Sequence, residues 1–158
     1  MPYSLRHLFQ TLLLLLIPTL LLSQQIQQTQ EDSFTRYELL APATQSFRII
    51  YDVTATAAGA RRYFNTIRPG SEPIVNGVYD MMTGTELPWA LVSGADAKKA
   101  GHARAREQGQ YIQIELARAV PELGGARIRI DKEYKDPVSY TKAGDIITFS
   151  RTLGIKRN

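Results

Sequence analysis

The sequence predicts an all-β protein, an antiparallel β-sandwich of about seven to nine short strands preceded by a signal-peptide helix. Apolar and polar residues alternate with a period of two in most of the chain after residue 34, which is typical of strands with one buried face. Glycine and proline turn signals separate these alternating stretches, as in folds built from two sheets of short antiparallel strands.

The first 23 residues are predicted to be a signal peptide. Arg6 supplies a positive charge ahead of an apolar run from Leu8 to Leu22, which is shorter than a comfortable membrane span and typical of a secretory signal. We expect cleavage after Ser23, with a periplasmic or extracellular protein as the product. The alternative is an uncleaved signal anchor, which would be the protein's only contact with a membrane.

Three segments are therefore expected: the signal peptide 1–23, a Gln-rich polar linker 24–33 without periodicity, and one β-sandwich domain 34–158. The chain ends soon after its last expected strand, so we expect this domain to be the front part of a longer protein. Cysteine is absent, which excludes disulfides and thiolate metal sites and favours a bacterial envelope over a disulfide-stapled extracellular module.

The first two alternating stretches are 44–56, which places four apolar side chains on one face, and 61–68, which ends at the breaker "PGSEP". Residues 74–92 are predicted to be two strands joined by a turn at Thr83–Gly84. Pro88 indicates that the second of them is an edge strand or contains a bulge, because proline cannot donate to a ladder.

Residues 93–110 interrupt the pattern, since they contain no β-branched residue and are rich in Ala, Lys and Arg. We expect a mobile surface excursion here, with about two helical turns between 95 and 107 as the alternative. His102 lies in this segment and is expected to be solvated.

Alternation returns in 110–117 and in "GGARIRIDKEY" (124–134), whose two arginines occupy every second position. Arg127, Arg129 and Asp131 alternate with small or branched apolar residues, so we interpret them as the solvated side of a strand rather than as a site.

Residues 136–145 are expected to form a loop, and 146–155 the last strand. The apolar faces of the strands together supply the predicted core. Its members are Phe47, Ile49, Tyr51, Val53, Ile112, Ile114, Leu116, Ile128, Ile130, Ile147 and Phe149.

Few of the residue types that catalysis requires are present. Of the two histidines, His7 belongs to the signal peptide, so a zinc site or a Ser-His-Asp triad would depend on His102 alone. The acidic residues lack the spacing of a calcium loop. The formal net charge of +4 is not concentrated in a basic stripe as in nucleic-acid-binding proteins. We expect no cofactor, no metal and no nucleic-acid partner.

One S-x-x-K sequence occurs at Ser139–Lys142, the spacing used by penicillin-recognising enzymes. It lies in a turn-rich stretch, and the S-D-N and K-T-G motifs of those enzymes are absent. We interpret it as a chance match, with a small hydrolase as the alternative.

The aromatic residues suggest a second kind of site. Trp89, the single tryptophan, together with Tyr63, Tyr79, Tyr111 or Tyr134 would make a surface on which sugar rings stack. We select Trp89, Tyr79 and Tyr111 as candidate ligand-binding residues, although a lone tryptophan more often packs against the core.

The stretch "SFRIIYDVTAT" resembles the opening strand of the N-terminal sandwich domain of M1-type metallopeptidases. Asp80, Thr83, Gly84 and Leu87 match a "D…TG…L" hairpin of that domain, and "YIQIELARAVPELGGARIRIDKEY" is similar to its later strands. The resemblance covers about residues 45–135 and includes no catalytic motif. It implies a non-catalytic front domain and transfers no active-site residue.

The sequence therefore predicts a non-catalytic accessory or interaction domain of an exported envelope protein, forming the N-terminal domain of a larger peptidase-like protein. The expected partner is a C-terminal catalytic domain or an envelope polymer. The alternative is a carbohydrate-binding module that uses Trp89 and nearby tyrosines.

Overall fold

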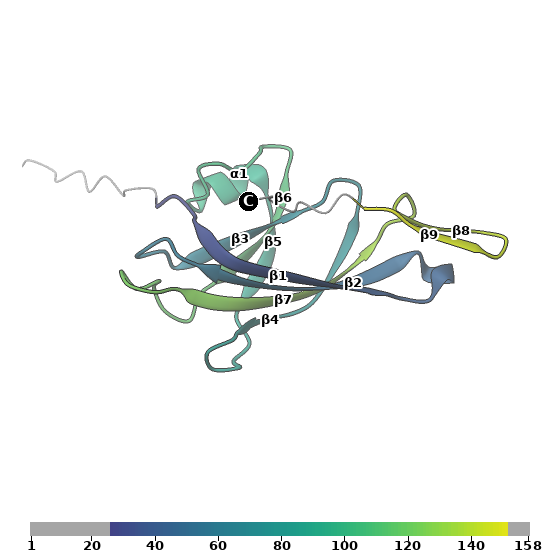
Figure 1. Cartoon of the computed structure of the whole chain (residues 1–158). Coiled ribbons are helices and arrows are strands. Elements are labelled where there is room, and N and C mark those ends of the chain that lie inside the picture. Colours follow the sequence, from purple (N-terminus) through teal and green to yellow (C-terminus); the bar gives the residue numbers. More distant parts are fainter. Residues whose placement is uncertain (1–25, 152–158) are drawn as a thin grey trace, which may run out of the picture.

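Two antiparallel sheets and a separate hairpin contain the nine strands found in the computed structural model, which describes residues 26–151 (Figure 1). The predicted all-β, sandwich-like fold is confirmed. The predicted signal peptide, 1–23, lies outside the described residues. Within the described part of the chain, no helix combines the length and the apolar composition needed to cross a bilayer.

The larger sheet has four strands in the order β1–β2–β7–β4. They are β1 (Gln30–Leu39), β2 (Ser46–Ala55), β7 (Ala126–Lys135) and β4 (Glu72–Asp80). The two central strands come from the two long alternating stretches of the sequence, and they pair with each other along their whole length. The first strand begins at Gln30, four residues before the expected start of the domain at Phe34.

The smaller sheet has three strands in the order β3–β6–β5. They are β3 (Arg62–Ile67), β6 (Gln110–Glu115) and β5 (Trp89–Ser93). Pro88 directly precedes β5. This strand lies at the edge of its sheet, as we predicted from the missing N–H of Pro88. Beside β5 lies the only α-helix of the described residues, α1 (Gly94–Lys99), and a short 3-10 turn, η1 (Pro42–Thr44), joins β1 to β2.

Two strands joined by a turn form within 74–92, as predicted, but beyond the turn they do not pair with each other. The turn at Thr83–Gly84 forms, with Gly84 at φ +75° and its N–H donating to the Asp80 carbonyl at 2.7 Å. After a short bridge the chain crosses over, so that β4 belongs to the larger sheet and β5 to the smaller one. In the smaller sheet β5 pairs with β6, with Ile114 opposite Trp89.

One core lies between the inner faces of the two sheets, and most of its predicted members are confirmed. The buried members are Phe47, Ile49, Val53, Ile112, Ile114, Ile128 and Ile130, joined by Tyr63, Ile67, Val78 and Tyr134. Tyr51, Leu116 and Phe149 are partly buried at its margin. The prediction is wrong for Ile147, whose side chain is 50% exposed.

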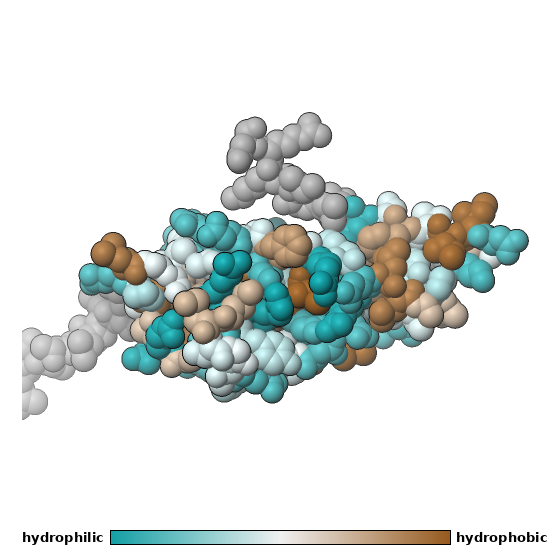
Figure 2. All heavy atoms as spheres, turned by 60° about the horizontal axis from the view of Figure 1, so that its bottom comes forward, coloured by the Kyte–Doolittle hydropathy of each residue, from teal (hydrophilic) through white to brown (hydrophobic). Residues whose placement is uncertain are grey.

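Ile147 is exposed because its strand belongs to a two-stranded hairpin that extends beyond the sandwich (Figure 1). The hairpin consists of β8 (Tyr140–Ala143), in the segment expected to be a loop, and β9 (Ile146–Phe149). No second sheet covers it, so alternation there does not lead to burial. Figure 2 shows hydrophobic residues gathered at this end of the molecule, where Val138 and Ile146 are among the most exposed apolar side chains.

Cross-strand ion pairs hold several of the charges on the outer face of the larger sheet. Arg129 donates to both oxygens of Asp52 at 2.8 Å, and Arg48 donates to Asp131 in the same bidentate way. These arginines lower the pKa of both carboxyl groups. The interpretation of the 124–134 charges as the outward side of a strand is confirmed, although Arg48 leaves Asp131 only 9% exposed.

Lys132 is an exception, because it lies in the inward-facing phase of β7 and is only 5% exposed. Its ammonium group donates to Oδ1 of Asn65 on the opposite sheet and lies 5.2 Å from the centre of the Tyr134 ring. Burial, and to a lesser extent the charge of Arg151, lowers the pKa of Lys132 to about 7. The alternation of β7 indicates that the Lys132 side chain faces inward, because Lys132 lies two positions after the inward-facing Ile130.

We expect Lys132 to make stability depend on pH. The unfolded chain, in which lysine keeps its ordinary pKa of 10.5, binds more protons than the folded chain above pH 7. The free energy of unfolding should therefore rise between pH 7 and 9.5 by roughly 3 kcal/mol more in the natural protein than in Lys132→Met. Urea denaturation of both proteins at several pH values measures this difference.

Lys135→Met on the same strand is the matched control, because Lys135 is exposed and its replacement should leave the pH dependence unchanged. Parallel pH profiles for the natural protein and Lys132→Met would show that Lys132 keeps an ordinary pKa.

Candidate functional site

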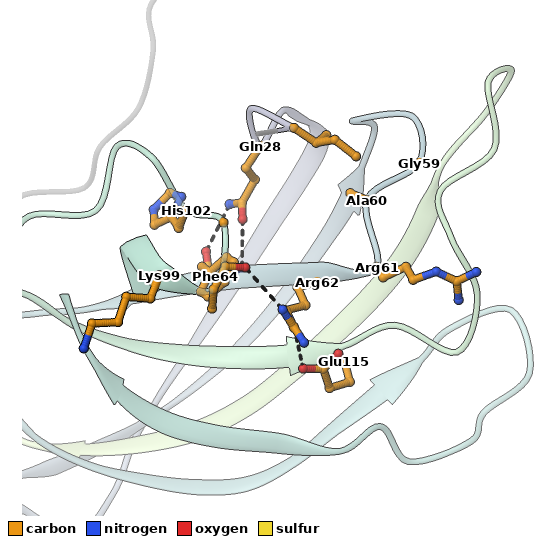
Figure 3. A pocket seen from close by; sticks show the side chains of 12 residues that line it. Gln28, Gly59, Ala60, Arg61, Arg62, Phe64, Lys99, His102 and Glu115 are labelled. Carbon is orange, nitrogen blue, oxygen red and sulfur yellow. Dashed lines mark hydrogen bonds and ion pairs between the residues drawn. The ribbon is translucent and has the colours of Figure 1, made fainter. Parts of the chain in front are cut away.

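A cleft of about 610 Å³ lies over the outer face of β3 and the end of β6 (Figure 3). Its walls are the segment 26–28, the turn 59–61 and the turn 99–102 that follows α1. The volume is in the range of natural ligand sites. The cleft is therefore the main candidate for a binding site among the described residues.

One wall of the cleft belongs to the segment 93–110, which is packed on the smaller sheet. Ala97 and Ala105 are 0% and 4% exposed, and they lie against Phe64 and Tyr111 in a second, smaller core. The short alanine side chains let the segment approach the sheet closely. The prediction of a mobile excursion is therefore wrong, and its alternative, a helix, holds for the first part of the segment.

His102 lies in the same wall and is half-buried rather than solvated, which corrects the expectation from the sequence. Its ring stacks on Phe64, with centroids 5.0 Å apart and planes 8° from parallel, and meets the edge of Tyr111 at 5.2 Å. Burial lowers the pKa of His102, so the neutral imidazole is favoured. This ring is a structural part of the wall, and no hydrogen bond or ion pair among residues 26–151 connects it to a carboxylate or a serine.

The opposite wall is a strap, defined here as residues 26–30, and it corrects the expectation of a flexible linker. The amide of Gln28 donates to the Phe64 carbonyl at 3.0 Å and accepts the Phe64 N–H at 2.8 Å. Gln30 accepts from the Tyr63 hydroxyl and donates to Tyr51 at 2.9 Å. Glutamine side chains thus tie this segment to both sheets, through contacts that have no periodic signature.

Positive charge predominates in the cleft. Arg62 is paired with Glu115 at 2.7 Å, whereas Arg61 forms no ion pair with a described residue. Lys99 lies 3.3 Å from Asp96, but both side chains are exposed, so this pair is weak. Figure 3 shows Lys99 on one side of the cleft and Arg61 on the other. This arrangement was not predictable from the sequence, because Arg61 and Lys99 belong to distant segments without a shared motif.

The three aromatic residues selected from the sequence do not form a common platform. Tyr111 is 3% exposed, and its hydroxyl accepts the Arg106 N–H at 2.8 Å. Tyr79 lies on the outer face of the larger sheet, where a Cβ added at Gly77 would overlap its hydroxyl. Trp89 is 36% exposed on edge strand β5 of the other sheet. No ring pair among the described aromatic side chains includes Trp89 or Tyr79.

The S-x-x-K residues also remain apart. Ser139 is 3% exposed and accepts a hydrogen bond of 2.9 Å from Arg68, whereas Lys142 is exposed on β8. Neither residue lines the cleft. Among residues 26–151 there is also no group of three His, Asp or Glu side chains placed to hold a metal ion.

We expect Gln28→Ala to loosen the strap. The substitution removes both side-chain hydrogen bonds to Phe64, and it should lower the free energy of unfolding by about 1–3 kcal/mol. Amide hydrogen exchange at Phe64 should become faster at the same time. Gln108→Ala is the matched control, because Gln108 is exposed and forms no side-chain hydrogen bond within the described chain. Equal stability and exchange in both variants would contradict a structural role for the strap.

No family model matches this sequence, and no curated protein is detectably similar to it. The resemblance to the front domain of M1-type metallopeptidases therefore remains a prediction that rests on sequence motifs.

Proposed function

We propose that this chain is a non-catalytic interaction domain of an exported envelope protein and that the cleft beside β3 is its binding site for an acidic ligand. The observation that carries the proposal is the charge of the cleft. Within the described part of the chain, Arg61 and Lys99 line it without a strong ion pair, while the one acidic side chain of the lining, Glu115, is already paired with Arg62. A cleft lined in this way attracts negative groups.

The lining suits binding better than catalysis. His102 stacks on Phe64 and meets the edge of Tyr111, and within residues 26–151 no hydrogen bond connects it to a base or nucleophile. Ser139 is buried and does not line the cleft. The remaining lining consists of the strap, small residues, Phe64, Glu115 and the cationic side chains, which provide shape, hydrogen bonds and charge.

The apolar N-terminal run supports export, and the motif resemblance supports a place in front of a peptidase-like catalytic domain. In this proposal the acidic ligand belongs to an envelope polymer or to the partner domain. A carbohydrate-binding module is the second candidate, and the partial exposure of Trp89 is the observation that favours it.

The proposal is tested by titrating the purified chain with labelled poly-L-glutamate, polygalacturonate and neutral dextran. We expect the two polyanions to bind and dextran to remain unbound. Binding should weaken as salt rises from about 20 to about 300 mM, because the exposed charges are then screened. Arg61→Ala combined with Lys99→Ala should weaken binding of the polyanions about tenfold or more.

Lys135→Ala combined with Lys142→Ala is the matched control, since it removes the same charge from exposed positions that do not line the cleft. An equal loss of affinity in both double variants would mean that net charge, and not the cleft, binds the polymer. Binding of dextran that quenches Trp89 fluorescence would favour the carbohydrate module instead.

A further inference from the structure

We infer that the ligand of the cleft is an acidic peptide in an extended conformation, which adds as a strand to the open edge of β3. This inference rests on the proposed function and specifies the class of ligand that the same cleft takes. Three features of the described residues lead to it: the backbone of β3, the amide of Gln28, and the separation of the cationic side chains.

The pairing of β3 with β6 determines which of its backbone groups are open. Leu116 donates its N–H to the Arg61 carbonyl at 2.9 Å, and hydrogen-bonded positions alternate from there along the antiparallel pair. The N–H and C=O of Arg62 and Phe64 therefore point away from β6. Because β3 is at the end of its sheet, these groups lie on an edge without a neighbouring strand.

Gln28 shows that this edge accepts a peptide-like group. Its side-chain amide donates to the Phe64 carbonyl and accepts the Phe64 N–H, the same two hydrogen bonds that the N–H and C=O of one residue in an added antiparallel strand would make. Arg62 presents the equivalent pair of groups two residues earlier. The strap occupies the edge at Phe64, and the cleft continues along it at Arg62.

The cationic side chains match an elongated ligand better than a single small anion. Lys99 and Arg61 lie on opposite sides of the cleft with Arg62 between them (Figure 3). An added strand carries side chains at regular intervals, so its acidic residues reach more than one of these positions. A polysaccharide supplies acidic groups at intervals as well, but it lacks the paired N–H and C=O that the edge of β3 accepts.

The experiment uses the acidic peptide acetyl-Ser-Glu-Val-Glu-Val-Glu-Ser-amide with the purified chain. Two further peptides have the same sequence and are N-methylated either at the valines or at the glutamates. In an added strand, only one of these two sets of N–H groups faces β3. We expect methylation of one set to weaken binding about tenfold or more and methylation of the other set to have little effect.

Amide hydrogen exchange provides an independent readout at the predicted contact. Exchange of the Arg62 N–H should become about tenfold slower or more when the unmethylated peptide is bound. The Phe64 N–H, which Gln28 already holds, should change little. The Arg61→Ala, Lys99→Ala double variant should bind the peptide about tenfold more weakly than the Lys135→Ala, Lys142→Ala control does.

The outcomes separate this inference from the function on which it rests. If the polyanions and the peptide bind through Arg61 and Lys99, but both methylated peptides bind equally well and Arg62 is not protected, the cleft binds acidic ligands without strand addition. Such a result overturns the inference and leaves the proposed function standing. If no acidic probe binds through these two residues, both are overturned.

Discussion

The rest of the structure depends on the ten-residue pairing of β2 with β7. It runs without interruption from Ser46 opposite Lys135 to Ala55 opposite Ala126. A shift of one residue would turn the outward set of side chains, including Arg129 and Asp131, into the core. The register is therefore held by two effects that agree: burial of the inward apolar side chains, and the ion pairs that the outward charges form across the strands.

The cleft is a consequence of how the two sheets are joined at one edge. β1 pairs with β2, and the strap that leads into β1 reaches across to the smaller sheet. Gln30 forms side-chain hydrogen bonds with Tyr51 on one sheet and Tyr63 on the other. Gln28 hydrogen-bonds the backbone of β3 at Phe64 only. The strap thus leaves the next part of that edge open, and its residues 26–28 form one wall of the cleft.

Charge is distributed unevenly over the two sheets. On the larger sheet, Arg129 and Arg48 are paired at short range with Asp52 and Asp131. In the cleft, Arg61 has no such partner within the described chain, and Lys99 is only weakly paired. The net charge of the whole sequence, +4, therefore indicates less about binding than the positions of the cationic side chains that lack a strong ion pair within the described chain.

The sequence by itself determined the strands that have one buried face. Their period-two pattern is local, and it defines which side chains of each strand face the core. Most core residues and the turn at Thr83–Gly84 were predictable on that basis. Alternation does not say whether a second sheet will cover a face, and for this reason Ile147 was misplaced. Tertiary structure alone decided which sheet β5 joins, how the strap is fixed and where Arg61 and Lys99 meet a common cleft. These features depend on contacts between residues far apart in the chain, such as Gln28 with Phe64, and such contacts leave no periodic trace in the sequence.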